Sequence, residues 1–151
     1  MALSLSHDVA DYLAHQHVMT LATQGNEGPW AAALFYARDD DDLIFLSSPL
    51  SRHSQNLNLQ PRCAATIQGD SKEWQDIKGI QIEGIARETT GAEISRARTR
   101  YAARFPFVRP GVAAPAIALA LQRVRWYRLQ VTRLYFIDNL RGFGKRQQFD
   151  A

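Results

Sequence analysis

The stretch of this sequence best equipped for chemistry is the segment LSSPLSRHS at residues 46–54. It joins the expected end of a strand to the expected start of a helix, where unpaired backbone N–H groups and the helix dipole favour anions. Ser51 adds a hydroxyl, Arg52 a two-pronged cation suited to phosphate, and His53 a further hydrogen-bond donor. The segment therefore fits a phosphate site, although the same residues are common in simple helix capping.

A second feature is the run of small residues Ala31, Ala32 and Ala33 inside an otherwise bulky apolar segment. Strands usually carry β-branched or aromatic residues, so three consecutive alanines are unusual. Because alanine side chains are small, a flat ligand could lie against the backbone of this segment. Tight packing against Trp30, Phe35 or the strand expected at residues 77–87 explains the same run equally well. The sequence alone leaves both interpretations open.

The elements that must position these residues are short strands and helices. Apolar and β-branched runs between polar turns predict strands, and helical spacing after serine or before proline predicts helices. We expect strands at residues 17–23, 29–37, 43–47, 62–68, 77–87 and 124–137 (the last as one strand or a pair), helices at 6–15, 51–60, 90–104 and 113–121, and a glycine-rich loop at 138–145. The chain has no βαβ rhythm and no GxGxxG or GxxxxGK[ST] motif. The predicted class is mainly β with α (α+β), a small antiparallel barrel with peripheral helices.

Length and composition fit one intracellular domain that spans residues 1–151. Hydrophobic residues make up 46% of the chain and charged residues 22%, as in ordinary globular proteins. No apolar run approaches the roughly 20 residues needed to cross a bilayer, and no signal peptide is recognisable. Cys63 is the one cysteine, so no intrachain disulfide is possible and the cytoplasm is the expected location.

The charged clusters favour structural roles over nucleic-acid or metal binding. Net charge is +3, and the late arginines, among them Arg96, Arg98, Arg100 and Arg104, are expected mainly on solvated faces, although such clusters can meet phosphates. They lack a nucleic-acid recognition motif, so nucleic-acid binding ranks last. The aspartates at residues 39–42 are expected to form a solvated hairpin turn rather than a weak cation site. No metal site is expected.

The order of the segments resembles that of the FMN-binding split-barrel superfamily, the pyridoxamine 5′-phosphate oxidase-like proteins. HVMTLAT is followed by PWAAALFYA, by LIFLSSPLSRHSQNLNLQPRCAATI and by GIQIEGIARE. The later pieces Arg104-Phe105-Pro106 and GFGK, which begins at Gly142, look like the narrower YhbP-like subgroup, UPF0306. The resemblance covers nearly the whole chain. It implies a split barrel and a homodimer whose two FMN sites are each built by both chains.

The resemblance also implies FMN contacts for individual residues. Arg52 and His53 match the pair that grips the FMN phosphate, next to Ser51. The other implied contacts are the strand end Leu46 and Ser47, the ring-lining segment Ala31, Ala32, Ala33 and Leu34, and the tail residues Phe143 and Lys145, which could reach the ring of the partner chain.

Two departures from the family pattern bear on function. Many relatives carry Arg-Lys where this chain has Arg52 and His53, so phosphate binding is expected to be weaker or pH-dependent. Ala31 stands where pyridoxamine 5′-phosphate oxidases place an arginine, and their basic-and-tyrosine grip on pyridoxal phosphate is missing. We therefore do not expect oxidation of vitamin B6.

These observations predict an FMN-binding flavoprotein, a flavin-dependent oxidoreductase or reductase of unidentified substrate. No side chain stands out as an acid, base or nucleophile, so we assign no catalytic residue and leave the chemistry to the cofactor. The alternative is a non-catalytic binder or sensor of flavin, haem or another planar ligand on the same barrel. For haem, His53 and His17 are the first candidate ligands.

Overall fold

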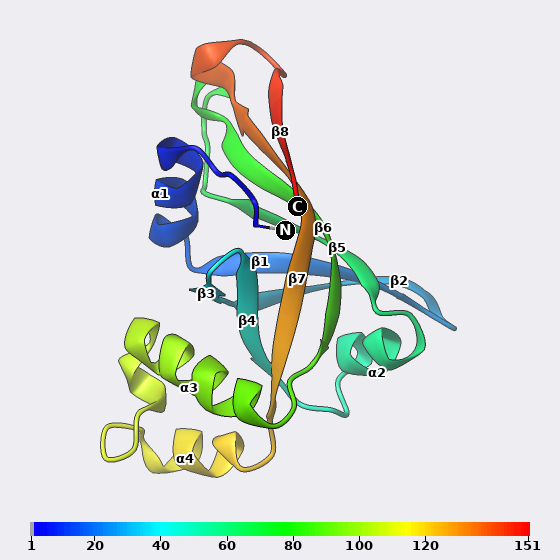
Figure 1. Cartoon of the computed structure of the whole chain (residues 1–151), viewed down its shortest axis with the longest axis vertical. Helices are drawn as coiled ribbons and strands as arrows, with labels where there is room; N and C mark the ends of the chain where they lie inside the picture. Colours follow the sequence, from blue (N-terminus) through cyan, green and yellow to red (C-terminus); the bar gives the residue numbers. More distant parts are fainter. Residues whose placement is uncertain (1) are drawn as a thin grey trace.

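The structure of the protein, a computed structural model, describes residues 2–151 and consists of a curved sheet with helices at its margins (Figure 1). The strands are β1 (Val18–Gly25), β2 (Gly28–Phe35), β3 (Ala37–Asp39), β4 (Asp42–Ser47), β5 (Arg62–Gln68), β6 (Lys78–Glu88), β7 (Arg125–Asp138) and β8 (Arg146–Asp150). The α-helices are α1 (His7–His15), α2 (Arg52–Leu59), α3 (Ala92–Arg104) and α4 (Pro115–Leu121). Short 3₁₀ turns are η1 (Trp74–Asp76), η2 (Pro106–Val108) and η3 (Asn139–Arg141).

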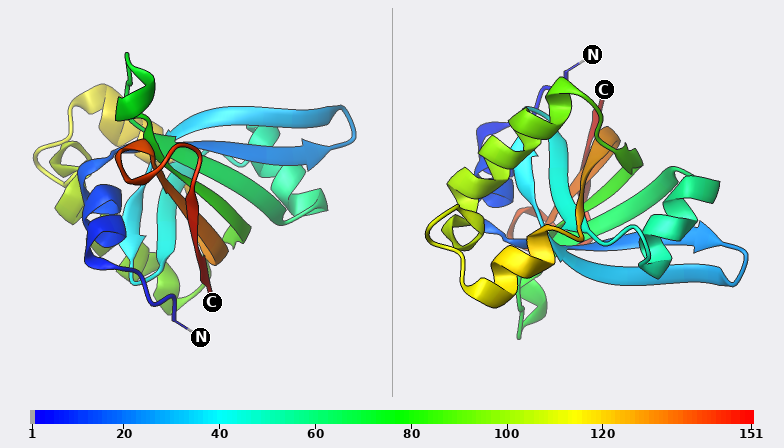
Figure 2. Two further views of the ribbon diagram at one scale, coloured as in Figure 1. Left: turned by 90° about the horizontal axis from the view of Figure 1, so that it is seen from above. Right: turned by 90° about the horizontal axis from the view of Figure 1, so that it is seen from below.

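The strands form one antiparallel sheet in the order β2-β1-β5-β6-β7-β4-β3, with β8 paired to β7. Strands β2 and β4 are not neighbours in this order, yet they contact each other. The sheet therefore curls into a partly open barrel, as the views along its length show (Figure 2). The predicted α+β class and the split barrel are confirmed.

The alternation of side chains along the strands determines the barrel interior. In β6, Ile80, Ile82 and Ala86 are buried and the residues between them are exposed, except for the buried Gly84. The register between β6 and β7 shifts at Gly84, where an added Cβ would lie 2.5 Å from the carbonyl oxygen of Gln130. The bulge that the sequence suggests for this strand is present, and glycine allows the close approach of β7.

A second, smaller core lies between the sheet and α3. Ala97 and Tyr101 of α3 pack with Phe105 against Ile44 of β4 and Ala37 of β3. Helix α3 therefore covers the β3–β4 side of the barrel, whereas α2 lies on the opposite side beside β1 and β2 (Figures 1 and 2).

The structure differs from the predicted elements in two places. The segment expected as one strand at residues 29–37 is divided at Tyr36 into β2 and β3. Strand β8 follows the glycine-rich loop and was not predicted, because its sequence RQQFD is short, polar and located at the sheet edge. The final segment at residues 124–137 forms the single long strand β7.

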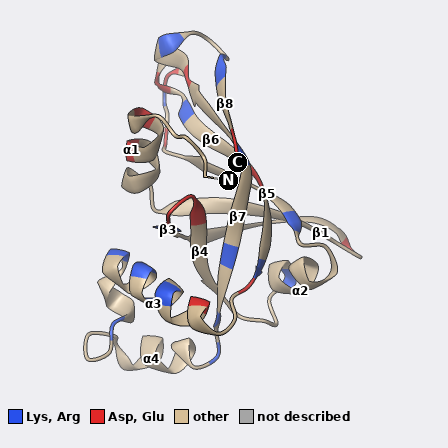
Figure 3. Ribbon diagram, in the orientation of Figure 1, with Lys and Arg blue, Asp and Glu red and all other residues tan. Residues whose placement is uncertain are grey.

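Charged residues lie on α1 and α3 and along strands such as β6 and β7, whereas α4 carries none (Figure 3). Across residues 2–151, none of the helices combines the length and the apolar character that crossing a membrane requires.

Candidate functional site

Local hydrogen bonds and close packing fix the start of α2 at the end of β4. Ser51 is the N-cap of the helix, and its hydroxyl accepts a hydrogen bond from the Ser54 N–H at 3.2 Å, as the sequence predicts. Asn56 donates to the Thr23 hydroxyl at 3.0 Å. A Cβ at Gly25 would lie 1.9 Å from the Asn56 side-chain oxygen, so glycine lets α2 pack closely on β1. The helix N-terminus is thereby positioned beside the β1–β2 hairpin.

Three hydroxyls and one imidazole gather at this helix start. The Ser47 hydroxyl lies 2.5 Å from Nε2 of His53, and the Ser51 hydroxyl lies 3.2 Å from the same nitrogen. The Ser54 hydroxyl is 2.8 Å from that of Ser51 and 3.0 Å from that of Ser47. We refer to Ser47, Ser51, His53 and Ser54 as the hydroxyl cluster. It joins the end of β4 to the start of α2, the junction at which the sequence predicts a phosphate.

His53 is buried within the hydroxyl cluster, with 8% of the residue exposed. Burial lowers the pKa of His53 below its ordinary value of 6.5, because the charged form loses hydration. The ring is therefore neutral near pH 7 and orders the helix start through hydrogen bonds. Arg52 is left as the cation of the predicted phosphate-binding pair.

The buried imidazole predicts a loss of stability in mild acid. Below pH 6.5 the unfolded chain takes up a proton at His53, whereas the folded protein does so only below the lowered pKa. The free energy of unfolding should fall between about pH 7.5 and about pH 5.5, and H53Q should flatten that fall. Urea denaturation at both pH values measures this difference.

The matched control is H15Q, which removes an imidazole whose side chain is 73% exposed. Equal pH dependence in wild type and H53Q would contradict the assignment to His53.

Arg52 projects toward the β1–β2 hairpin and stacks on Trp30. Its guanidinium carbon lies 4.4 Å from the centroid of the Trp30 ring, and Nη2 donates to the Glu27 carbonyl at 3.1 Å. The Glu27 carboxylate, 3.8 Å from Nη1, is 82% exposed and so contributes little. Nε of Arg52 is buried without a hydrogen-bond partner in the described chain. Stacking thus orients the guanidinium while N–H donors remain unused.

Strand β2 presents its alanines at an open edge of the sheet. Among the described strands β2 pairs with β1 alone, so backbone groups along its other edge have no strand partner. Ala31 and Ala33 are exposed, and Ala32 and Leu34 are half-buried. Phe35 instead packs on Phe105, with ring centroids 5.1 Å apart. The small side chains therefore leave space beside the backbone rather than filling a packed core.

The remaining predicted contacts do not join this group within one chain. The Leu46 side chain packs against the second core on the α3 side, whereas Ser47 enters the hydroxyl cluster. Phe143 is 75% exposed and contacts Trp74, with ring centroids 5.7 Å apart. Phe143 and Lys145 lie between η3 and β8, at the end of the molecule away from α2 (Figure 1).

Two members of the site were not identified from the sequence. Ser54 lies three residues after the N-cap Ser51, a spacing that brings side chains together at a helix start and could have indicated its role. Trp30 was considered only as a packing residue. Its stacking on Arg52 depends on how α2 docks against β2, which no local pattern reveals.

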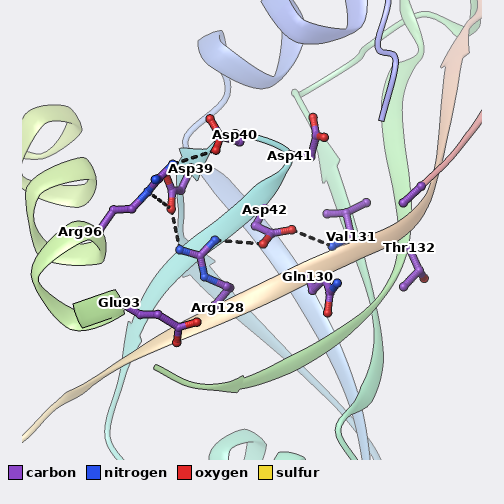
Figure 4. A pocket seen from close by; sticks show the side chains of 11 residues that line it. Asp39, Asp40, Asp41, Asp42, Glu93, Arg96, Arg128, Gln130, Val131 and Thr132 are labelled. Carbon is purple, nitrogen blue, oxygen red and sulfur yellow. Dashed lines mark hydrogen bonds and ion pairs between the residues drawn. The ribbon is translucent and has the colours of Figure 1, made fainter. Parts of the chain in front are cut away.

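A separate charged cavity of about 630 Å³ lies between the β3–β4 hairpin, β7 and the start of α3 (Figure 4). The solvated turn predicted at residues 39–42 is wrong for Asp39, whose side chain is 1% exposed. Asp39 accepts hydrogen bonds from Arg96 at 2.7 Å and from Arg128 at 2.5 Å. Arg96, Arg98 and Arg100 of α3 lie on an exposed face, as predicted, although Arg96 and Arg100 also pair with Asp39. Arg128, whose side chain is 14% exposed, does not fit that prediction.

We refer to the interacting residues as the arginine–aspartate network: Asp39, Asp40, Asp42, Arg96, Arg100 and Arg128. Each of its carboxylates has an arginine partner. The network therefore acts as a clamp between α3 and the sheet and leaves no unpaired charge for a ligand.

Comparison with known proteins gives matches over most of the chain. Residues 5–138 match the family described as Pyridoxamine 5′-phosphate oxidase. A UPF0306 protein from Photorhabdus laumondii is 33% identical over 137 residues, which cover 89% of this chain and 88% of that protein.

Two solved structures share the fold. A haem-binding protein from Mycobacterium smegmatis superposes with a TM-score of 0.72 at 22% identity, over 92% of this chain and 55% of that one. HutZ, the haem storage protein from Vibrio cholerae, gives 0.69 at 19% identity, over 87% and 91% of the two chains.

Proposed function

Because the chain belongs to the pyridoxamine 5′-phosphate oxidase family, and within it to the UPF0306 proteins, we propose that it is an FMN-binding flavoprotein. In this function residues 1–151 form one cytoplasmic domain, and the phosphate of the bound FMN lies at the start of α2.

The observation that carries the proposal is the state of Arg52. Its guanidinium is held by Trp30 at the N-terminus of α2, has no buried carboxylate partner, and keeps an unpartnered Nε in the described chain. A phosphate monoester at this position would accept charge-assisted hydrogen bonds from Arg52 and from the first N–H groups of α2. The Ser51 and Ser47 hydroxyls of the hydroxyl cluster lie next to the same helix start. The residues present therefore fit the phosphate of FMN.

The flavin ring is assigned to the open edge of β2. A planar ring can approach the backbone of Ala31, Ala32, Ala33 and Leu34, because these side chains are small or half-buried. Leu46, whose side chain faces the second core, would contribute through its backbone.

A second copy of the chain would complete the site. In one chain the edge of β2 lies open, and Val18, Trp30 and Phe35 are exposed around it. Large exposed apolar side chains of this kind are typical of protein interfaces. In the proposed homodimer, Phe143 and Lys145 of one chain reach the flavin of its partner, since the segment between η3 and β8 that carries them lies at the end of the molecule away from α2 (Figure 1).

FMN, when bound, supplies hydride and electron transfer, so the reaction class is oxidation or reduction of a small molecule. The protein residues hold the phosphate, orient the ring and exclude water. His53, neutral and buried, positions Ser47 and Ser51 and carries no charge to the phosphate near pH 7. Ala31 in place of an arginine argues against vitamin B6 oxidation.

The visible absorbance spectrum of freshly purified protein, followed by titration with FMN, tests the proposal. We expect either a co-purified flavin spectrum or saturable FMN binding with one site per chain. Colourless protein that neither changes the FMN spectrum nor gains thermal stability from FMN would overturn it.

Haem is the second candidate ligand, favoured by the availability of His17. Two proteins of this fold are described as haem-binding and haem storage proteins. The two predicted haem ligands differ in accessibility, because His53 is enclosed in the hydroxyl cluster whereas His17 is exposed, 6.2 Å from the Phe105 ring centroid. Adding haemin in a parallel titration separates the two candidates, since axial ligation by His17 would give a Soret shift that H17A abolishes.

A further inference from the structure

A cavity of about 470 Å³ lies at the meeting point of α1, β1, β3 and α3, away from the start of α2. Figures 1 and 2 place α2 on one side of the barrel and α1 and α3 on the other. The residues that line the cavity are Ala14, His17, Ala37, Arg38, Arg100, Ala103 and Arg104. Its walls are basic, its other side chains are alanines, and no carboxylate lines it.

The positive charge of this cavity is not cancelled by its surroundings. The neighbouring arginine–aspartate network contains three arginines and three aspartates. Arg100 donates to Asp39 at 3.1 Å, so its positive charge is already compensated within that network. Arg38 and Arg104 form no ion pair with any described residue. Two guanidinium charges therefore remain uncompensated around one hollow.

Backbone carbonyls hold these two arginines in place without neutralising them. Arg38 donates from Nη2 to the Asp40 carbonyl at 3.1 Å. Arg104 donates to the carbonyl oxygens of Ala14 and Gln16 at the end of α1, and its Nε lies buried without a partner in the described chain. The carbonyls orient the guanidinium groups, while the remaining N–H donors keep their capacity for an anion.

We propose that this cavity is a second anion site, which binds a small oxyanion that carries at least two negative charges. Arg38 and Arg104 provide the charge, and Arg100 and His17 provide further N–H donors. The small side chains of the lining alanines leave room in the cavity for such an anion. Phosphate esters and polycarboxylates share the required chemistry, since both present paired oxygens to a guanidinium fork. The site is independent of the proposed flavin site because no residue is common to both.

Isothermal titration calorimetry on the full chain tests the proposal, with inorganic pyrophosphate and citrate as separate probes. The R52A background is used throughout, so that the proposed FMN phosphate site does not contribute. We expect saturable binding of at least one probe, and the stronger probe identifies the anion class. Adding R38A should weaken that binding by about tenfold or more, because one charge-assisted contact is lost.

The matched control is R98A, which removes an exposed arginine of the same helix α3 that does not line the cavity. It should change the affinity by less than about twofold. R104K provides a second variant, which keeps the positive charge but loses the planar fork, and it should also weaken binding. The proposal is overturned if neither probe binds, or if R98A weakens binding as much as R38A.

Discussion

Replacing Arg52 with alanine is expected to weaken FMN binding by about a hundredfold or more. The guanidinium is the cation at the start of α2, and Trp30 holds it 4.4 Å from the ring centroid. Two charge-assisted hydrogen bonds to phosphate at about 1.5 kcal/mol each account for that factor. Titration of wild type and R52A with FMN, followed by the change in flavin absorbance or fluorescence, measures it.

Riboflavin, which lacks the phosphate, provides the sharpest control for this result. If Arg52 acts on the phosphate, R52A should leave riboflavin affinity almost unchanged, and wild type should bind riboflavin no more tightly than R52A binds FMN. R98A should bind FMN as wild type does, since Arg98 lies exposed on α3, across the barrel from α2. An R52A protein that binds FMN with wild-type affinity would remove the phosphate site from the start of α2.

R52K distinguishes charge from geometry at the same position. Lysine keeps the positive charge but cannot form a two-pronged contact or stack as a plane on Trp30. We therefore expect FMN affinity between those of R52A and wild type. Affinity equal to wild type would indicate that charge alone suffices.

The local parts of the site could be predicted from the sequence because short-range rules control them. Ser51 as N-cap and the start of α2 follow from side-chain chemistry within a few residues. Only six residues separate Ser47, at the end of β4, from Ser54, in the first turn of α2. Because the connecting turn is this short, the polar side chains at its two ends lie close together. The sequence did not reveal that His53 would turn inward and become neutral, because its burial depends on the packing of α2 against the sheet.

Long-range contacts explain most of what could not be predicted. The four aspartates at residues 39–42 have the composition of a solvated turn, and Asp39 is buried only because arginines 57 and 89 residues away reach it. Leu46 faces the second core because α3 covers that side of β4. Phe143 and Lys145 are proposed to contact the flavin of the partner chain. Sequence patterns within one chain do not reveal a contact between two chains.

Replacing Asp39 with alanine is expected to destabilise the fold by about 3 kcal/mol. The Asp39 side chain is 1% exposed and accepts hydrogen bonds from Arg96, Arg100 and Arg128. Its removal leaves Arg128, whose side chain is 14% exposed, with excess charge that solvent screens poorly. Urea denaturation of wild type and D39A at neutral pH measures the difference.

D40A is the matched control for this variant. The Asp40 side chain is 78% exposed and pairs with Arg96 at the surface, so its removal should cost less than about 1 kcal/mol. If D39A fails to fold, D39N keeps the shape of the side chain and should still be less stable than D40A. Equal stability of the Asp39 and Asp40 variants would contradict a stabilising role for the buried ion pairs of Asp39 between α3 and the sheet.

The pH dependence of the same pair of proteins tests whether the charge of Asp39 is responsible. Burial alone would raise the pKa of Asp39, but hydrogen bonds from Arg128 and Arg96 outweigh burial and hold the pKa below its ordinary value of 3.8. The stabilisation is therefore fully present above that value and is lost as the pH falls through the lowered pKa of the folded state. The stability difference between wild type and D39N should accordingly be constant near neutral pH and shrink below about pH 4. A difference that persists unchanged in acid would mean that Asp39 stabilises α3 by its shape and neutral hydrogen bonds rather than by its charge.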